Sequence, residues 1–107
     1  MPKYPRLASR PIDHFAKRQT WPRGHMISTA PMEAEIIRRI AERLHKYKRE
    51  NYTTQKSMAK RSGISPDALS RLMRGESWGT LSVIARLEKG LQIDLWCDKL
   101  HKYPNEW

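Results

Sequence analysis

Residues 54–75 read TQKSMAKRSGISPDALSRLMRG, two short amphipathic segments on either side of Gly63. Thr54 is a favourable helix N-cap, because its hydroxyl can accept a hydrogen bond from a backbone N–H of the first turn. We therefore predict a helix from Thr54 to about Ser62. Gly63 has no Cβ and can adopt the left-handed conformation that ends a helix, so it predicts a tight turn at this point.

The second segment has start and stop signals of its own. Ser65 can cap a helix, Pro66 is favourable at the first helical position, and Asp67 complements the positive helix N-terminus. Gly75 is expected to end this helix. Apolar residues at helical spacing predict the buried side chains, which are Met58 and Ala59 in the first helix and Leu69, Leu72 and Met73 in the second.

Two longer helices are predicted to flank this pair. Residues 31–50 carry an apolar stripe at helical period, formed by Ile36, Ile37, Ile40, Leu44 and Tyr47. Thr80 can cap a further helix that runs to about Lys89 and ends at Gly90. Its inward-facing side chains are expected to be Leu81, Ile84, Ala85 and Leu87. For residues 91–107, a short helix over 94–101 and a strand over 91–96 are both compatible with the pattern.

Residues 1–30 differ from the rest of the chain in composition. They hold four of the seven prolines, which lack a backbone donor and disfavour a long helix. A short helix over residues 12–18 fits the pattern. Otherwise we predict an extended basic arm that only a partner would order. The expected fold is therefore all-α, a compact bundle of four to five short helices with a central helix-turn-helix, preceded by this arm.

Charge is the strongest feature of the composition. The 107 residues contain 21 Lys and Arg against 11 Asp and Glu, a formal net charge of +10. Summed by segment, residues 1–30 carry +5, residues 31–75 carry +6 and residues 76–107 carry −1. A domain this basic favours a polyanionic partner, nucleic acid before a membrane, over a basic protein that is merely well solvated.

Other functional classes lack their signals. The single cysteine, Cys97, cannot form an internal disulfide, and the four histidines do not fall at metal-ligand spacings. We find no nucleophile–base motif, phosphate-cradling glycine loop, signal peptide or apolar run long enough to span a bilayer. The expectations are a cytoplasmic protein that is not an enzyme, with no cofactor, no metal and no membrane partner.

The spacing of small and apolar residues resembles that of the lambda-repressor-like helix-turn-helix family, also called the XRE or Cro/C1 type. The likeness covers about residues 36–95. It is carried by a set of residues at fixed intervals: Gln55, Ala59, Gly63, Ile64, Leu69, Leu72, Gly75, Leu81, Ile84, Ala85, Leu87 and Leu91. It implies a unit in which the second helix of the pair lies in the major groove of DNA.

The resemblance also implies a set of DNA-contacting residues. Gln55 would touch a phosphate and brace the recognition helix, with Lys56 and Lys60 beside it. The groove-facing positions would be Ser65, Pro66, Asp67, Ser70 and Arg71, with Arg74 near a phosphate one turn further on. The departure from the family pattern is Pro66, where relatives often carry a side chain that hydrogen-bonds a base.

Each residue at this tip has two interpretations. Pro66 can offer a base only apolar contact, for instance with a thymine methyl. Asp67 either accepts from a cytosine amino group or only stabilises the helix dipole. Arg71 either reads guanine, the commonest specific arginine contact, or binds a phosphate.

The arm and the C-terminal end each have two interpretations as well. The arm would place Arg6, Arg10, Lys17, Arg18 and Arg23 in a minor groove, or it is a solvated tail. We divide the chain into this arm (1–30), the DNA-binding domain (31–95) and a C-terminal extension (96–107). The extension either covers the domain's own core or binds a partner through Trp96, Leu100, Tyr103 and Trp107.

We predict a sequence-specific, DNA-binding transcriptional regulator with double-stranded DNA as its partner. A small phage-type repressor is favoured, since little chain follows the helical domain. The alternative is an antitoxin that binds a toxin and represses its own operon, and a third class is a protein-interaction module that never binds DNA. A homodimer is expected because two-fold proteins read palindromes, with a monomer as the alternative.

Overall fold

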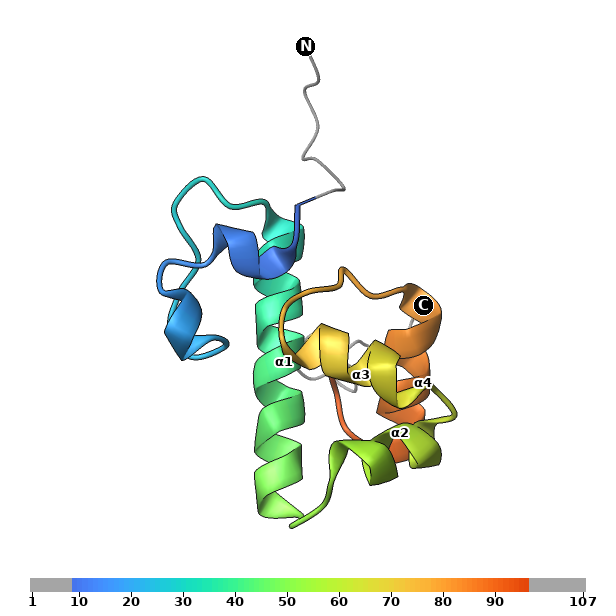
Figure 1. The fold of residues 1–107 in the computed structure, drawn as a ribbon. Helices are drawn as coiled ribbons and strands as arrows, with labels where there is room; N and C mark the ends of the chain where they lie inside the picture. Colours follow the sequence, from blue (N-terminus) through green and yellow to red (C-terminus); the bar gives the residue numbers. More distant parts are fainter. Residues whose placement is uncertain (1–8, 97–107) are drawn as a thin grey trace, which may run out of the picture.

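The computed structural model describes residues 9–96. Four α-helices make up the body of this part, namely α1 (Met32–Glu50), α2 (Gln55–Ser62), α3 (Pro66–Met73) and α4 (Leu81–Leu91) (Figure 1). Two short 3-10 helices, η1 (Pro11–His14) and η2 (Arg18–Thr20), precede them. Residues 9–96 contain no β-strand beyond an isolated bridge between Phe15 and Met26. The predicted all-α bundle is confirmed.

α1 forms where the sequence placed it. Pro31 stands just outside its first turn, and Glu33 and Glu35 lie in that turn, where negative charge favours the helix. One stripe of the helix is buried, made up of Ala34, Ile37, Ile40, Ala41 and Leu44. This stripe packs against η1 and α3, so α1 is the support on which the rest of the domain is assembled.

The helix pair α2–α3 follows the predicted capping pattern. The Thr54 hydroxyl accepts from the backbone N–H of Ser57 at 3.1 Å, and the Ser65 hydroxyl accepts from that of Ala68 at 3.1 Å. Gly63 has φ +71°, the left-handed conformation that the turn requires. The side chains predicted to be buried in both helices are fully covered. The two caps and the turn therefore fix α3 at a defined angle to α2.

The end of α4 differs from the prediction. The helix continues through Gly90 to Leu91 and ends at Gln92, which takes the left-handed conformation with φ +58°. Gly90 instead lies where α4 crosses α2 most closely, because a Cβ at this position would stand 2.6 Å from the Cα of Ser62. The glycine is thus required for helix–helix contact and not for helix termination.

Two of the four residues expected to face inward from α4 do not. Leu81 is 72% exposed and Ala85 is also exposed, whereas Ile84, Leu87 and Leu91 form the buried stripe. The expectation was wrong because apolar residues occur on two faces of this helix, and only the face that carries Ile84, Leu87 and Leu91 is covered by the rest of the domain.

Residues 92–96 form neither of the two structures considered for them. Leu95 is buried, and its backbone N–H donates to the carboxylate of Glu88 at 2.8 Å. Its carbonyl oxygen accepts from Arg43 of α1 at 3.0 Å. This short segment therefore closes the bottom of the core between α1 and α4. Residues 97–107, including Leu100, Tyr103 and Trp107, lie outside the described residues.

The N-terminal segment, here residues 9–30, is not an extended arm. Pro11, Phe15 and Pro22 are buried, and Phe15 meets the ring of Trp21 edge-on at a centroid distance of 5.2 Å. η1 packs against α1, and the Trp78 indole N–H donates to the carbonyl oxygen of Ser9 at 2.6 Å. The prediction of an extended arm was wrong for these residues, because their prolines and aromatic rings form an apolar patch of their own. Arg6 lies outside the described residues.

Candidate nucleic-acid interface

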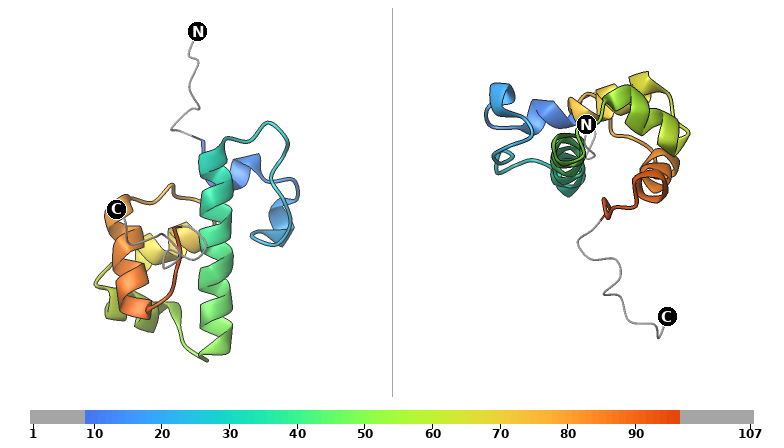
Figure 2. Two further views of the ribbon diagram at one scale, coloured as in Figure 1. Left: turned by 180° about the vertical axis from the view of Figure 1, so that it is seen from behind. Right: turned by 90° about the horizontal axis from the view of Figure 1, so that it is seen from below.

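α2, α3 and the N-terminal segment lie along one side of the molecule, with α1 and α4 behind them (Figure 2). α3 presents one covered and one open face. Leu69, Leu72 and Met73 are buried beneath it, while Pro66, Asp67 and Arg71 are exposed. An exposed helix face on a packed support is the geometry that can enter a major groove.

An ion pair that was not expected from the sequence joins the first turn of α3 to its last turn. Arg71 Nη1 lies 3.6 Å from a carboxylate oxygen of Asp67, one turn earlier, and the two side chains are 55% and 75% exposed. A pair this exposed contributes no more than about 0.5 kcal/mol to stability. Asp67 can thus bias the direction of Arg71 without preventing the guanidinium from reaching a ligand.

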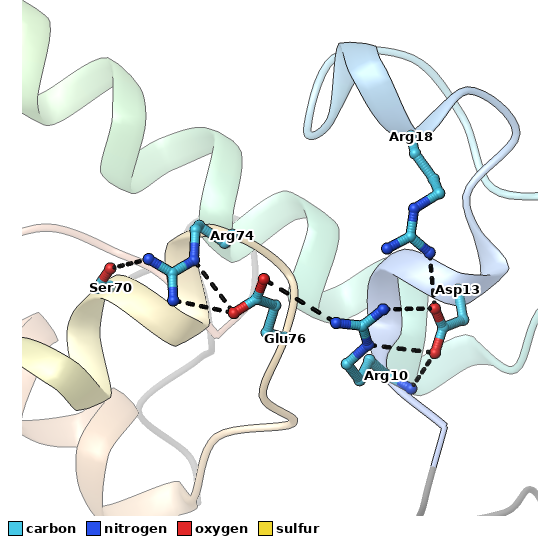
Figure 3. Close-up of polar contacts among 6 residues, drawn as sticks. All are labelled: Arg10, Asp13, Arg18, Ser70, Arg74 and Glu76. Carbon is cyan, nitrogen blue, oxygen red and sulfur yellow. Dashed lines mark hydrogen bonds and ion pairs between the residues drawn. The ribbon is translucent and has the colours of Figure 1, made fainter.

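The last turn of α3 is bound more tightly to its own neighbours. Arg74 donates to the hydroxyl of Ser70 at 2.8 Å and to the carboxylate of Glu76 at 2.9 Å (Figure 3). The other carboxylate oxygen of Glu76 lies 4.0 Å from Arg10 of the N-terminal segment. The structure therefore brings Ser70 and Arg74 together, and Glu76 offsets part of the Arg74 charge.

A second acid organises the cations of the N-terminal segment. The Asp13 carboxylate accepts from the backbone N–H of Arg10 at 2.8 Å, from the Arg10 side chain at 3.2 Å and from Arg18 at 2.8 Å (Figure 3). These hydrogen bonds, the backbone one foremost, hold the pKa of the Asp13 carboxyl well below its usual range. Lys17 and Arg23 are exposed and have no ion pair within residues 9–96.

α2 supplies the remaining predicted contacts. Gln55 is half-buried at the first position of the helix, while Lys56 and Lys60 are exposed and have no ion pair within the described part of the chain. The turn after α2 is secured from α4, because Arg86 donates to the carbonyl oxygen of Gly63 at 3.1 Å. Sequence reasoning gave Arg86 no role, since the partner of a long exposed arginine is set only by tertiary packing.

The C-terminal end of α3 is anchored by residues that sequence reasoning also missed. The last carbonyls of a helix lack partners within the helix. Here the carbonyl oxygen of Met73 accepts from the Trp21 indole N–H at 3.0 Å. It also lies 3.1 Å from His45 Nε2 of α1, which must carry the hydrogen because a carbonyl can only accept. The next open carbonyl, that of Gly75, accepts from the backbone N–H of Ile12 at 3.0 Å.

Gly75 explains why this contact is so close. It has φ +74°, and a Cβ on it would stand 2.7 Å from the ring of Trp21. The N-terminal segment therefore packs directly on the turn that follows α3. The signal in the sequence was the Phe and Trp pair inside an otherwise polar, proline-containing stretch.

Comparison with known proteins agrees with this geometry. A family model described as "Helix-turn-helix" matches residues 44–95, from the middle of α1 through α4. These residues are a helix-turn-helix domain of the lambda-repressor-like type. The helix-turn-helix domain is a DNA-binding regulatory unit, so the match supports DNA binding and transcription regulation by these residues. Searches of curated proteins and of solved structures returned no match.

The helix-turn-helix match does not extend over the contacts made by the N-terminal segment. Residues 9–43 precede it, and they include Trp21, one of the two donors to the end of α3. No helix among residues 9–96 is long and apolar enough to cross a membrane. The same residues contain no group of three His, Cys, Asp or Glu side chains placed to hold a metal ion.

Proposed function

We propose that the chain is a small phage-type repressor that binds operator DNA with α3 in the major groove. The observation that carries this proposal is that α3 is held at both ends while its outer face stays open. Ser65 caps its start, and the Trp21 and His45 side chains bind its last carbonyl. A rigid reading helix loses little conformational freedom when it binds, which favours discrimination between sequences.

We assign base contacts to the exposed tip of α3. Arg71 would bind the O6 and N7 atoms of a guanine, and Pro66 would contact a thymine methyl. Asp67 would orient Arg71 across their 3.6 Å pair, which gives the acid at the tip a role beyond the helix dipole. A direct contact with a cytosine amino group remains the alternative for Asp67.

We assign phosphate contacts to the surrounding polar residues. On α2 these are Gln55, Lys56 and Lys60. At the end of α3, Arg74 would exchange Glu76 for a phosphate oxygen, while Ser70, its hydrogen-bond partner in the free protein, keeps the groove-facing role expected from the sequence. Each phosphate contact should make the slope of log K against log[salt] steeper by about 0.9.

Binding-site selection from random DNA tests the base contacts. We expect wild-type protein to enrich one sequence, and Arg71→Ala to lose about 1–3 kcal/mol and become tolerant at a single base position. Lys89→Ala, an exposed cation near the end of α4, is the matched control and should leave the selected sequence unchanged. An equal loss of affinity on every sequence would make Arg71 a phosphate contact.

For the N-terminal segment we propose a DNA contact through the outer surface of the folded unit. Lys17 and Arg18 are exposed, and the segment that carries them lies on the same side as α2 and α3 (Figure 2). Deleting residues 1–28 would not isolate this contact, since it would also remove Trp21. Lys17→Gln with Arg18→Gln keeps the buried side chains of the segment but removes the hydrogen bond from Arg18 to Asp13, so circular dichroism must first show that the fold is kept. An unchanged affinity at low and moderate salt would then assign the segment to structural support alone.

The antitoxin reading is supported by Trp96, a large aromatic side chain that is 46% exposed at the end of the described residues. In that case, the product of a neighbouring gene should bind the chain. The Trp96→Ala variant should lose this binding and keep its affinity for the operator. A gel shift with the chain's own upstream DNA separates both readings from a protein-interaction module, which would give no shift with or without a partner.

We also propose that two copies bind two half-sites one helical turn apart. Sedimentation of the complex with a selected site should give two chains per duplex. One chain per duplex, with an asymmetric selected sequence, would establish a monomeric reader.

A further inference from the structure

A cleft lies beside the C-terminal end of α3, between the N-terminal segment and α1. It has a volume of about 460 Å³ and is lined by residues 20–23 on one side and by residues of α1 between Glu42 and Arg49 on the other. It is open to solvent on one side, so a group carried by a larger molecule can enter it. Of the residues that line it, only Arg23 was given a binding role from the sequence, as part of the possible DNA-binding arm.

The lining of this cleft is strongly cationic. Arg23, Arg43, Lys46 and Arg49 all contribute to it, against a single acid, Glu42. Glu42 is already paired, because a carboxylate oxygen lies 3.0 Å from Arg38. The cleft therefore concentrates positive charge that its own acid does not neutralise.

Three of the cations are available to a ligand. Arg43 donates to the carbonyl oxygen of Leu95 at 3.0 Å, so it is engaged. Arg23, Lys46 and Arg49 have no ion pair or side-chain hydrogen bond among residues 9–96. A site with two guanidinium groups and an ammonium group suits a phosphate, whose non-bridging oxygens accept paired hydrogen bonds from arginine.

The position of the cleft relates it to the DNA-facing side. Trp21 and His45 belong to its walls, and both bind the carbonyl oxygen of Met73, the last residue of α3. The cleft therefore begins where the recognition helix ends. A helix in the major groove is flanked by sugar–phosphate backbone, since the groove is only about 12 Å wide.

We propose that this cleft binds a phosphate group through Arg23, Lys46 and Arg49. The proposal rests on the operator-binding function for its preferred ligand, a backbone phosphate next to the stretch that α3 reads. The same chemistry would accept a phosphate of a small molecule, which would then contact the walls that hold α3. The cleft thus adds a phosphate site contributed by α1 and the N-terminal segment, neither of which belongs to the helix-turn-helix pair.

The experiment uses the full chain with Arg23→Gln and Arg49→Gln together, which removes two charges while keeping long polar side chains. Lys89→Gln alone serves as the control. Adding Lys56→Ala to match the two lost charges would be unsuitable, because Lys56 is itself an expected DNA contact. The first measurement is the slope of log K against log[salt] for a selected DNA site. The second is a titration of the free protein with inorganic pyrophosphate, followed through the amide NMR signals of residues 20–23 and 42–49.

A backbone phosphate in the cleft predicts that the slope becomes shallower by about 0.9 or more in the double variant and is unchanged in the control. A small phosphorylated ligand predicts an unchanged slope, together with pyrophosphate shifts in the wild type that the double variant loses. Both results support a phosphate site and distinguish its source. An unchanged slope without such shifts overturns the proposal. If no DNA binds even the wild type, the repressor proposal fails, and the titration still decides whether the cleft is a phosphate site.

Discussion

Replacing Gly90 with alanine should destabilise the domain, although helix propensity predicts the opposite. Gly90 lies within α4, where glycine is less favourable than alanine by about 1 kcal/mol. An alanine Cβ, however, would stand 2.6 Å from Ser62 Cα and 2.8 Å from the Arg61 carbonyl oxygen. Both are backbone atoms of α2, so no change of rotamer can relieve the overlap.

The two effects can be weighed against each other. Inserting a methyl group into a well-packed contact costs about 1–3 kcal/mol. Subtracting a propensity gain of about 1 kcal/mol leaves a net loss of up to about 2 kcal/mol. Ala85→Gly in the same helix is the matched control, because Ala85 is exposed and reports propensity alone. It should cost about 1 kcal/mol.

Urea unfolding followed by far-ultraviolet circular dichroism measures both variants. With a slope of about 1–1.5 kcal/mol/M for a domain of this size, Gly90→Ala should lower the midpoint by about 1 M. A Gly90→Ala protein that is more stable than the wild type would refute the close α2–α4 contact. In that case Gly90 would behave as an ordinary helical glycine, which alanine replaces with a gain in stability.

Three further predictions concern single polar contacts. Ser62→Ala should be neutral or raise the free energy of unfolding by up to about 1 kcal/mol, because the buried Ser62 hydroxyl has no hydrogen-bond partner within residues 9–96. A clear loss of stability in urea unfolding would show that the hydroxyl does have a partner. Trp21→Phe should lower the free energy of unfolding by about 0.5–1.5 kcal/mol in the same assay, because it removes one of the two donors to the Met73 carbonyl while keeping an aromatic ring. An unchanged stability would show that the indole N–H is not needed there. Asp13→Asn should destabilise at pH 7. Because the pKa of Asp13 is lowered in the folded state, its contribution is present above the unfolded pKa of about 4 and is lost as pH falls below it, so wild type and variant should converge in acid. A difference that persists at low pH would contradict the hydrogen bonds from Arg10.

The sequence was informative where one residue type serves one local purpose. Thr54, Gly63 and Ser65 marked helix ends because capping and left-handed turns depend on the chemistry of a few neighbouring atoms. Period alone predicted the buried apolar residues of α2 and α3. In α1 it predicted Ile37, Ile40 and Leu44 correctly, but it also included Ile36 and Tyr47, which are only half-buried. These local signals sufficed for the fold class and for the position of the recognition helix.

The sequence was less informative where the reason for a residue lies in a distant part of the chain. In the sequence, Gly90 stands where a glycine would be expected to end a helix. Only the path of α2 shows that it instead allows the two helices to pack closely. Leu81 is as apolar as Leu87, and only the direction of α2 separates them. The N-terminal segment was misjudged because prolines and positive charge outweighed two aromatic residues in the pattern, whereas buried area decides its structure.

The candidate site shows the same division. The residues of its exposed tip could be named from the resemblance to the helix-turn-helix family. The pairing of Arg71 with Asp67, and of Arg74 with Ser70 and Glu76, depends on side-chain geometry. The cationic cleft combines residues from two segments about twenty positions apart. No local pattern connects them.

The docking of Trp21 on the turn after α3 has a consequence for the order in which the chain is made. Trp21 and Met73 are separated by 52 positions, and Ser9 and Trp78 by 69. The residues synthesised first are thus unable to complete their contacts until most of the domain has been translated. A nascent chain stopped before the turn should therefore leave the Phe15–Trp21 cluster open to proteases that cannot cut it in the finished protein, which makes this cluster a natural reporter of completed folding.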